Sequence, residues 1–152
     1  MPNRIAGIDP GKSGGIAFLS EAGPLAEPMP LCGKEIDGRY LAEWLKESAP
    51  DLVVVEKVGA MPGQGVTSMF TFGTGFGRVL GVIEALGLPY RLVTPQAWKK
   101  VVLAGTSRDK TAAVEFVNRA YPALNLAPGR KRVPHDGMAD AVCLAEYGRV
   151  TL

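Results

Sequence analysis

The stretch IAGIDPGKSGGIAF, residues 5–18, decides the fold that the sequence predicts. Residues 4–9 (RIAGID) are typical of a strand, the Pro-Gly pair that follows is typical of a turn, and residues 14–19 (GGIAFL) predict the returning strand of a hairpin. Asp9 ends the first of these strands. Because an acid after Ile-Ala-Gly-Ile cannot lie deep in a core unless it is paired or bound to metal, Asp9 is a candidate functional residue.

Another predicted strand, further along the chain, also ends in an acidic residue. Residues 51–56 (DLVVVE) carry a Leu-Val-Val-Val run without alternation, which favours a strand covered on both faces, as in a parallel sheet. Weaker strands are expected at residues 25–29 and 89–93. Helical spacing predicts helices at residues 36–48, 67–86, 94–101, 108–120 and 134–147. The order of these elements predicts one α/β domain over residues 1–152, with a mixed five-stranded sheet flanked by helices.

The bulk properties of the chain fit a globular protein and place few limits on its partners. The 152 residues fit one domain, and the net charge of +2 is a weak bias toward polyanions. Cys32 and Cys143 have no zinc-site spacing, so free thiols in a reducing cytosol are favoured over a disulfide. The sequence shows neither an apolar run of the ~18–20 residues that cross a bilayer nor a secretory signal. We therefore expect a cytoplasmic protein that does not bind a membrane.

Four acidic residues are expected to meet at one edge of the sheet. Asp9 and Glu56 end two strands that could lie side by side, and Asp136 and Asp140 share one face of the last helix because they are four residues apart. Two carboxylates ~4 Å apart repel each other by about 4 kcal/mol at an effective dielectric of about 20, and divalent metal would neutralise them. Oxygen ligands favour Mg²⁺ or Mn²⁺, and two such ions ~3.5–4 Å apart would stabilise the attacking and leaving oxygens in phosphodiester hydrolysis.

Each of these acids also has a structural explanation when it is considered singly. Asp9 before Pro-Gly is a common turn former, and Asp136 suits the positive end of the last helix. The hypothesis of a metal site therefore depends on whether the strands that carry Asp9 and Glu56 are neighbours.

The sequence resembles the RuvC family of Holliday junction resolvases in five segments that follow the family's order. These segments are IAGIDPGKSGGIAF, VVVEKV, FGTGFGRVLGVIEALGLP, TPQAWKKVVLAGTSRDKTAA and HDGMADAVCLAEY, and they cover nearly the whole chain. The resemblance implies an RNase H-like fold and a metal-dependent endonuclease that resolves four-way DNA junctions by paired symmetric nicks. It also implies two Mg²⁺ or Mn²⁺ ions per active site, a homodimer and no small-molecule cofactor.

The resemblance assigns catalytic and metal-binding roles to Asp9, Glu56 and Asp140, with Asp136 as the fourth ligand. Family members commonly carry that ligand three residues before the last Asp, where this chain has Gly137. Asp136 lies one residue earlier and reaches the same helix face, a spacing found in phage-type members.

Residues around the acids are candidates for DNA contact. Lys99 and Lys110 lie at positions of functional lysines in the family. His135 could contact a metal or the scissile phosphate from a second shell, although a lone His at a helix start is more often a cap. The candidate phosphate contacts, of which about half could be solvated surface charges, are Lys12, Lys57, Arg78, Lys99, Lys100, Lys110, Arg130, Lys131 and Arg132.

Three features depart from the family pattern or admit two interpretations. The family often has an aromatic residue after the Glu strand that stacks on a junction base, but Gly59 falls there, so Met61 or Phe70 would have to replace it. The glycine-rich helix at 67–86 is the candidate dimer interface, with an ordinary buried helix as the alternative. Trp98 is more typical of a core residue than of a base-stacking platform.

Other functions compete with junction cleavage. The DPGKSGG turn resembles the first phosphate hairpin of actin-like ATPases, but 152 residues leave no room for their second lobe. The turn is not a P-loop either, because Ala6 stands where that motif requires Gly. A non-catalytic junction-binding protein and an RNase H-like nuclease acting on RNA/DNA hybrids or branched flaps are the remaining alternatives.

Overall fold

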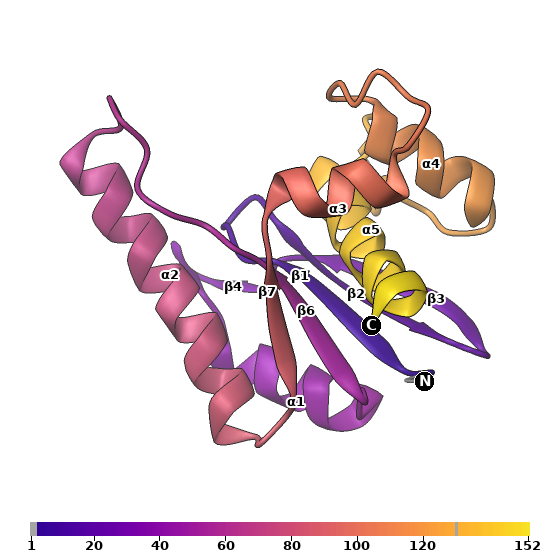
Figure 1. Ribbon diagram of the computed structural model, residues 1–152. Coiled ribbons are helices and arrows are strands. Elements are labelled where there is room, and N and C mark those ends of the chain that lie inside the picture. Colours follow the sequence, from indigo (N-terminus) through magenta and orange to yellow (C-terminus); the bar gives the residue numbers. More distant parts are fainter. Residues whose placement is uncertain (1–2, 130) are drawn as a thin grey trace.

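The computed structural model describes residues 3–129 and 131–152, which form an α/β domain around a five-stranded sheet (Figure 1). The strands of this sheet are β1 (Ile5–Asp9), β2 (Gly15–Ser20), β3 (Gly23–Pro28), β6 (Leu52–Glu56) and β7 (Tyr90–Val93). They lie in the order β3-β2-β1-β6-β7, with antiparallel pairing among the first three and parallel pairing of β1 with β6 and of β6 with β7. The mixed five-stranded sheet expected from the sequence is therefore confirmed.

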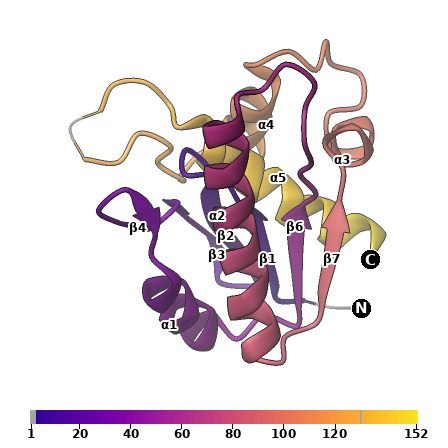
Figure 2. The same cartoon turned by 90° about the vertical axis from the view of Figure 1, so that its left-hand side faces the viewer.

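Helices cover both faces of the sheet (Figures 1 and 2). One face carries α1 (Gly38–Ser48) and α2 (Val66–Ala85), and the other carries α3 (Pro95–Val102), α4 (Ala112–Ala120) and α5 (Asp136–Thr151). Two separate clusters of buried apolar side chains, one on each face, hold the layers together. Because successive residues of a strand point to opposite faces, the apolar run of β6 serves both clusters.

Helix α5 lies so close to the sheet that backbone touches backbone. A Cβ atom built on Gly7 of β1 would lie 2.0 Å from the carbonyl oxygen of Ala141, and one built on Gly137 would lie 2.3 Å from the carbonyl oxygen of Ser13. No real side chain fits at such distances, so both positions require glycine. This contact sets the first turns of α5 directly against the β1–β2 turn.

Helix α2 stands largely free of the sheet. Among its residues, all of which the structure describes, Val79 and Ile83 are the buried ones. By length and composition alone, α2 could cross a bilayer, and 11% of its apolar window is buried inside the fold. This finding departs from the expectation that no apolar run is long enough, because the helix has only two charged residues, Arg78 and Glu84, among its apolar ones.

A small hairpin replaces the start of the expected first helix. Ile36, expected as its first residue, lies in β5 (Glu35–Ile36), which pairs antiparallel with β4 (Leu31–Cys32). The helix begins two residues later, at Gly38, because Asp37 acts as its cap, with its carboxylate accepting a hydrogen bond from the Tyr40 N–H at 3.0 Å.

Two further helix boundaries differ from the sequence-based expectation. Helix α4 begins at Ala112 and not at residue 108, because Arg108 has a left-handed backbone with a φ of 57°. The carboxylate of Asp109 then accepts hydrogen bonds from the backbone and hydroxyl of Thr111, which forms a turn in place of a helix. Helix α5 continues past residue 147 to Thr151.

Candidate active site

The ends of two neighbouring parallel strands bring Asp9 and Glu56 together. In the register of β1 and β6, Ile8 lies opposite Val55, so the next residue along each strand is an acid. Both acidic side chains are partly buried. The strand adjacency on which the expected acidic site depends is therefore confirmed.

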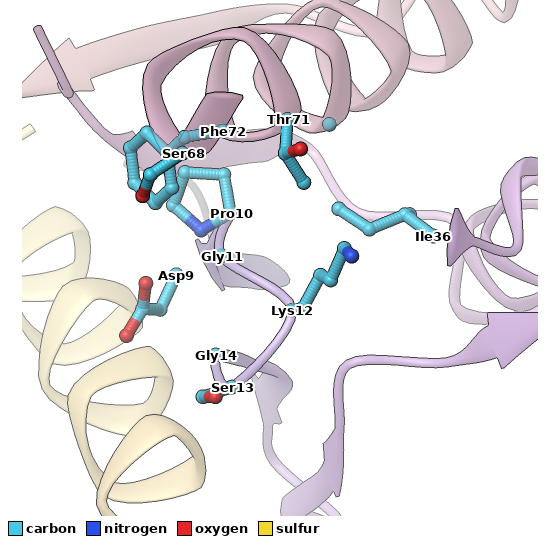
Figure 3. Close-up of a pocket in the computed structure, with 11 residues that line it drawn as sticks. Asp9, Pro10, Gly11, Lys12, Ser13, Gly14, Ile36, Ser68, Thr71 and Phe72 are labelled. Atoms are coloured by element: carbon cyan, nitrogen blue, oxygen red, sulfur yellow. The ribbon is translucent and has the colours of Figure 1, made fainter. Parts of the chain in front are cut away.

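Asp140 reaches the same edge of the sheet from α5. Its carboxyl group is partly buried, and the negative charges that act on it are those of Asp9, Glu56 and Asp136. The carboxylate of Asp9 points toward α5 in Figure 3, away from the adjacent cavity. Three segments that are far apart in the sequence thus each supply an acid to one location.

Burial and mutual repulsion raise the pKa values of these acids. The pKa of Asp9 rises to about 7, chiefly because burial penalises the charged form and then because Glu56 is negative. The pKa of Asp140 also rises to about 7, through burial first and then through the charges of Asp9 and Glu56. Carboxyl groups whose ionisation is this unfavourable would be stabilised in their charged form by a cation.

A buried indole holds Glu56 in place. Trp98 Nε1 donates a hydrogen bond of 2.7 Å to Glu56 Oε2, and Trp98 is 0% exposed, which confirms its expected core position. Burial raises the pKa of Glu56, whereas the Trp98 hydrogen bond and the positive charge of Lys99 oppose that rise. The sequence analysis did not predict this contact. The cap at Thr94 was the signal that could have indicated it, because it starts α3 directly after β7, the neighbour of the strand that carries Glu56.

The carboxylates do not form a ready-made ligand cage. Within residues 3–129 and 131–152, no three His, Cys, Asp or Glu side chains lie close enough together to hold one ion. One oxygen of Glu56 accepts the hydrogen bond from Trp98. The donor set fits Mg²⁺ or Mn²⁺ chemically, because it consists of carboxylate oxygens. The four-carboxylate ligand set stays a prediction.

The first turn of α5 explains why no acid stands at position 137. A side chain there would meet the Ser13 carbonyl oxygen at 2.3 Å, so the nearest residue that can carry an acid is Asp136, which is exposed. His135 caps α5, with Nδ1 accepting a hydrogen bond of 3.1 Å from the Met138 N–H. Because this bond occupies Nδ1, any contact of His135 with a metal or phosphate would have to use Nε2.

The basic residues expected to contact DNA differ in their surroundings. Arg78 ties α2 to β5, because Nη1 donates to the Ile36 carbonyl at 2.9 Å and Nη2 pairs with Glu35 at 3.1 Å. Lys99 is partly buried. Arg130 lies outside the described residues. The exposed candidates are Lys12, Lys57, Lys100, Lys110, Lys131 and Arg132. DNA contact by each of these residues stays a prediction.

A cavity of about 440 Å³ opens beside Asp9, between the β1–β2 turn and α2 (Figure 3). Residues 10–14 of the turn line one side, and Ser68 and Thr71 of α2 are among the residues on the other. The side chain of Lys12 extends into the space between the turn and α2. Of the three acids, Asp9 is the one whose residue borders this cavity.

Comparisons with known proteins define the class of the fold. No protein-family model matches the chain, and no curated protein matches it. Solved structures match it over almost its whole length, and they have the RNase H-like fold, with a mixed five-stranded sheet flanked by helices. The RNase H-like fold expected from the sequence is therefore confirmed.

The matching structures include several Holliday junction resolvases. RuvC of Thermus thermophilus superposes with a TM-score of 0.65 at 20% identity, over 95% of this chain and 92% of that chain. The same enzyme in complex with a Holliday junction substrate gives 0.66 at 20% identity, over 95% and 90%. The yeast mitochondrial resolvase Ydc2 gives 0.62 at 16% identity, over 95% and 77%. The resemblance to the RuvC family is thus confirmed at the level of the fold.

Proposed function

We propose that this protein is a metal-dependent endonuclease that resolves four-way DNA junctions, that is, a crossover junction endodeoxyribonuclease. The observation that carries the proposal is the convergence of Asp9, Glu56 and Asp140 from β1, β6 and α5, in a fold shared with Holliday junction resolvases. The pKa values of these three partly buried carboxyl groups are raised even though the positive charge of Lys99 acts on Glu56 and Asp140, so a purely structural role does not account for them.

Asp9, Glu56 and Asp140 would hold Mg²⁺ or Mn²⁺, two ions per site, with Asp136 as the fourth ligand. When bound, the ions would supply positive charge at the attacking and leaving oxygens of phosphodiester hydrolysis. The chain's own groups prepare the site for that role. The indole of Trp98 fixes one oxygen of Glu56, so the other oxygen stays available, and the packing of α5 on β1 fixes the backbone that carries Asp140.

Branched DNA is the proposed substrate. One matching RuvC structure contains a Holliday junction substrate. In this chain, Lys57 directly follows Glu56 and is exposed, and Lys99 and Lys100 lie on α3, whose Trp98 contacts the same acid. Positive charge around the acids suits the phosphates of DNA, and the affinity should therefore fall steeply as salt rises.

We further propose that two copies associate through α2. Val66 and Phe70 on this helix are 86% and 77% exposed. Among the described residues, nothing lies within 4 Å of a Cβ built on Gly73, Gly77 or Gly81. These glycines are spaced by four and share one face, which would let a second helix approach closely. Two copies would also supply the two active sites that paired symmetric nicks require.

Sedimentation analysis tests this association. The wild-type chain should sediment as a dimer, and Gly77→Leu should sediment as a folded monomer, because no described residue lies within 4 Å of a Cβ at this position, whereas a leucine there would block a second helix. A wild-type monomer at the concentrations that support cleavage would contradict the proposed dimer.

The free thiols fit a reducing compartment. Cys32 is exposed and Cys143 is buried, and neither forms a disulfide within the described residues. Exposed free thiols persist in the cytosol, so we propose a cytoplasmic location. Oxidation-sensitive labelling of Cys32 in cells would test it, since an oxidised thiol would contradict a reducing compartment.

The decisive experiment compares three labelled substrates: a mobile four-way junction, a linear duplex and an RNA/DNA hybrid. Each is incubated with the protein in the presence of Mg²⁺ or Mn²⁺, and again with a chelator. We expect symmetric nicks in opposed strands of the junction, with metal and with little cutting of the duplex. Binding without cutting would favour the non-catalytic junction binder, and cutting of the hybrid alone would favour an RNase H-like activity.

A further inference from the structure

A continuous groove leads from Asp9 along α2 to the β4–β5 hairpin. It consists of the cavity beside Asp9 and a second cavity of about 170 Å³, and both have Lys12, Ile36, Thr71 and Gly75 in their walls. Figure 3 shows the inner part, where the side chain of Lys12 extends between the turn and α2. Because the two cavities share these walls, a strand that passes Asp9 could continue from the inner cavity into the outer one.

The lining of this groove suits a polyanion. Lys12 and Lys34 lie in its walls and are exposed, and neither makes an ion pair within the described part of the chain. Glu35, an acid in the outer wall, is paired with Arg78 at 3.1 Å, so its charge is compensated. Hydroxyl groups that can donate to phosphate oxygens line the α2 side, at Ser68 and Thr71.

The groove also offers an aromatic surface. Phe70 lines the outer cavity and is 77% exposed, and Phe72 lines the inner one. A positively charged groove with accessible aromatic rings is the arrangement by which proteins bind single-stranded nucleic acid, since the cations follow the backbone and the rings stack on bases. Cavities of this volume accept a ligand of a few rings and not a duplex.

We infer that this groove carries the backbone of one DNA strand as it leaves the cleavage site, with Lys12 and Lys34 contacting its phosphates. The inference rests on the proposed function and extends it, because it assigns a strand path beyond the acids and adds Lys34 to the DNA-binding surface.

A pair of lysine substitutions tests the phosphate contact. Lys34→Ala is compared with Lys46→Ala, a matched control in the last turn of α1, since both residues are exposed and both changes remove one positive charge. The equilibrium constant for junction binding is measured over a range of salt concentrations. For Lys34→Ala we expect weaker binding and a salt slope lower by about 1, whereas Lys46→Ala should match the wild type. Equal slopes in all three proteins would overturn the inference.

The native cysteine provides an independent measure of the strand path. Cys32 is an exposed thiol in β4, where it pairs with Glu35 of the groove wall, and the other cysteine, Cys143, is buried. Junctions are made with a disulfide-forming tether at successive phosphates of the cleaved strand. Cross-linking should peak at phosphates a few nucleotides from the nick and disappear in Cys32→Ser. Equal cross-linking at all positions, or a peak on another arm, would overturn the inference.

The failure of this inference is distinguishable from failure of the proposed function. If the wild-type protein cuts junctions with metal but Lys34→Ala behaves like Lys46→Ala, the proposed nuclease function stands and the inferred strand path is wrong. If the wild-type protein neither binds nor cuts junctions, both the proposed function and the inferred strand path are wrong.

Discussion

Helices α2 and α5 are both rich in glycine, but the structure uses their glycines in opposite ways. In α5, a Cβ on Gly137 would lie 2.3 Å from a backbone oxygen, and one on Gly148 would lie 2.8 Å from a side-chain carbon of Val54. In α2, the outward Gly73 and Gly77 meet nothing within 4 Å among the described residues. The glycines of α5 are explained by contacts within the chain, whereas those of α2, apart from Gly75, which faces Ile36, are not.

This difference shows what each helix does for the site. Helix α5 is fixed to the sheet at backbone distance, so its Asp140 is held at the strand ends beside Asp9. Helix α2 lines the groove with one face and leaves another face open. The chemistry is therefore expected on the α5 side of the sheet, and association with partners on the α2 side.

The largest expected effect is the loss of cleavage on removal of an α5 charge. Asp140→Asn should lower the cleavage rate by roughly 10³-fold or more, because the site loses an acid that no neighbour replaces. Junction affinity should change little, since lysines provide it. The control is Glu43→Gln on α1, an exposed acid on the other face of the sheet. If Asp140→Asn cuts junctions at the wild-type rate with metal present, Asp140 has no role in cleavage.

The same substitution in the two helices should change stability in opposite directions. Gly137→Ala should lower the free energy of unfolding by about 3 kcal/mol, because the new methyl group meets the backbone of the β1–β2 turn. Gly77→Ala should raise the free energy of unfolding of the monomer by up to about 1 kcal/mol, since alanine is the better helix former and meets no neighbour. Denaturant titrations of both variants measure the contrast, and a stable Gly137→Ala would show that α5 can move away.

The stability of the metal-free protein should depend on pH because of the acids near α5. The pKa of Asp9 and that of Asp140 are each about 7 in the folded protein, above the value of about 3.9 expected in the unfolded chain. The stability contributed by their protonated forms is complete below pH ~4 and is lost as pH rises to about 7.

Chelator-treated protein should therefore unfold more easily at pH 7.5 than at pH 5, by on the order of 2 kcal/mol. Asp140→Asn should show a smaller decrease over the same range, because one of the two titrating groups is gone and the other loses a negative neighbour. Identical pH slopes for the variant and the wild type, measured by denaturant titration, would argue against raised pKa values at this site.

The smallest expected effect concerns the two tryptophans, one on each face of the sheet. Trp98→Phe should weaken metal binding by about tenfold, because the ring is kept while the N–H that orients Glu56 is lost. The matched control is Trp44→Phe on α1, a ring packed against Phe18 on the other face. Calorimetric titration with Mn²⁺ measures both. Equal metal affinities for the two variants would leave Trp98 with a packing role alone.

The sequence predicted the sheet and the strand-end acids because those features are local. The apolar run before Glu56 and the Pro-Gly turn after Asp9 indicate strand ends directly, and parallel neighbours place such ends together. The sequence also predicted the last helix, and it offered a role for His135 as the cap of that helix, which the structure shows. These features depend on patterns within a few residues of one another.

Other features depend on how distant elements are oriented, and no local pattern reports that. The hydrogen bond from Trp98 to Glu56 requires the angle between α3 and β6. The β4–β5 hairpin has strands of two residues each, which are too short to show a periodic pattern. The sequence does not distinguish the glycines of α2 from those of α5. Their different roles follow from the distances between a Cβ at each position and its neighbours in the folded chain.

The close packing of α5 on the sheet determines when the set of acids is completed during synthesis of the chain. Ribosomes release the N-terminal part of a chain first, and the described strands all precede α5 in the sequence. A nascent polypeptide that already contains both strand-end acids therefore still lacks Asp140. Under the proposed function, a nascent chain would therefore acquire its complete set of acids only when α5 has emerged.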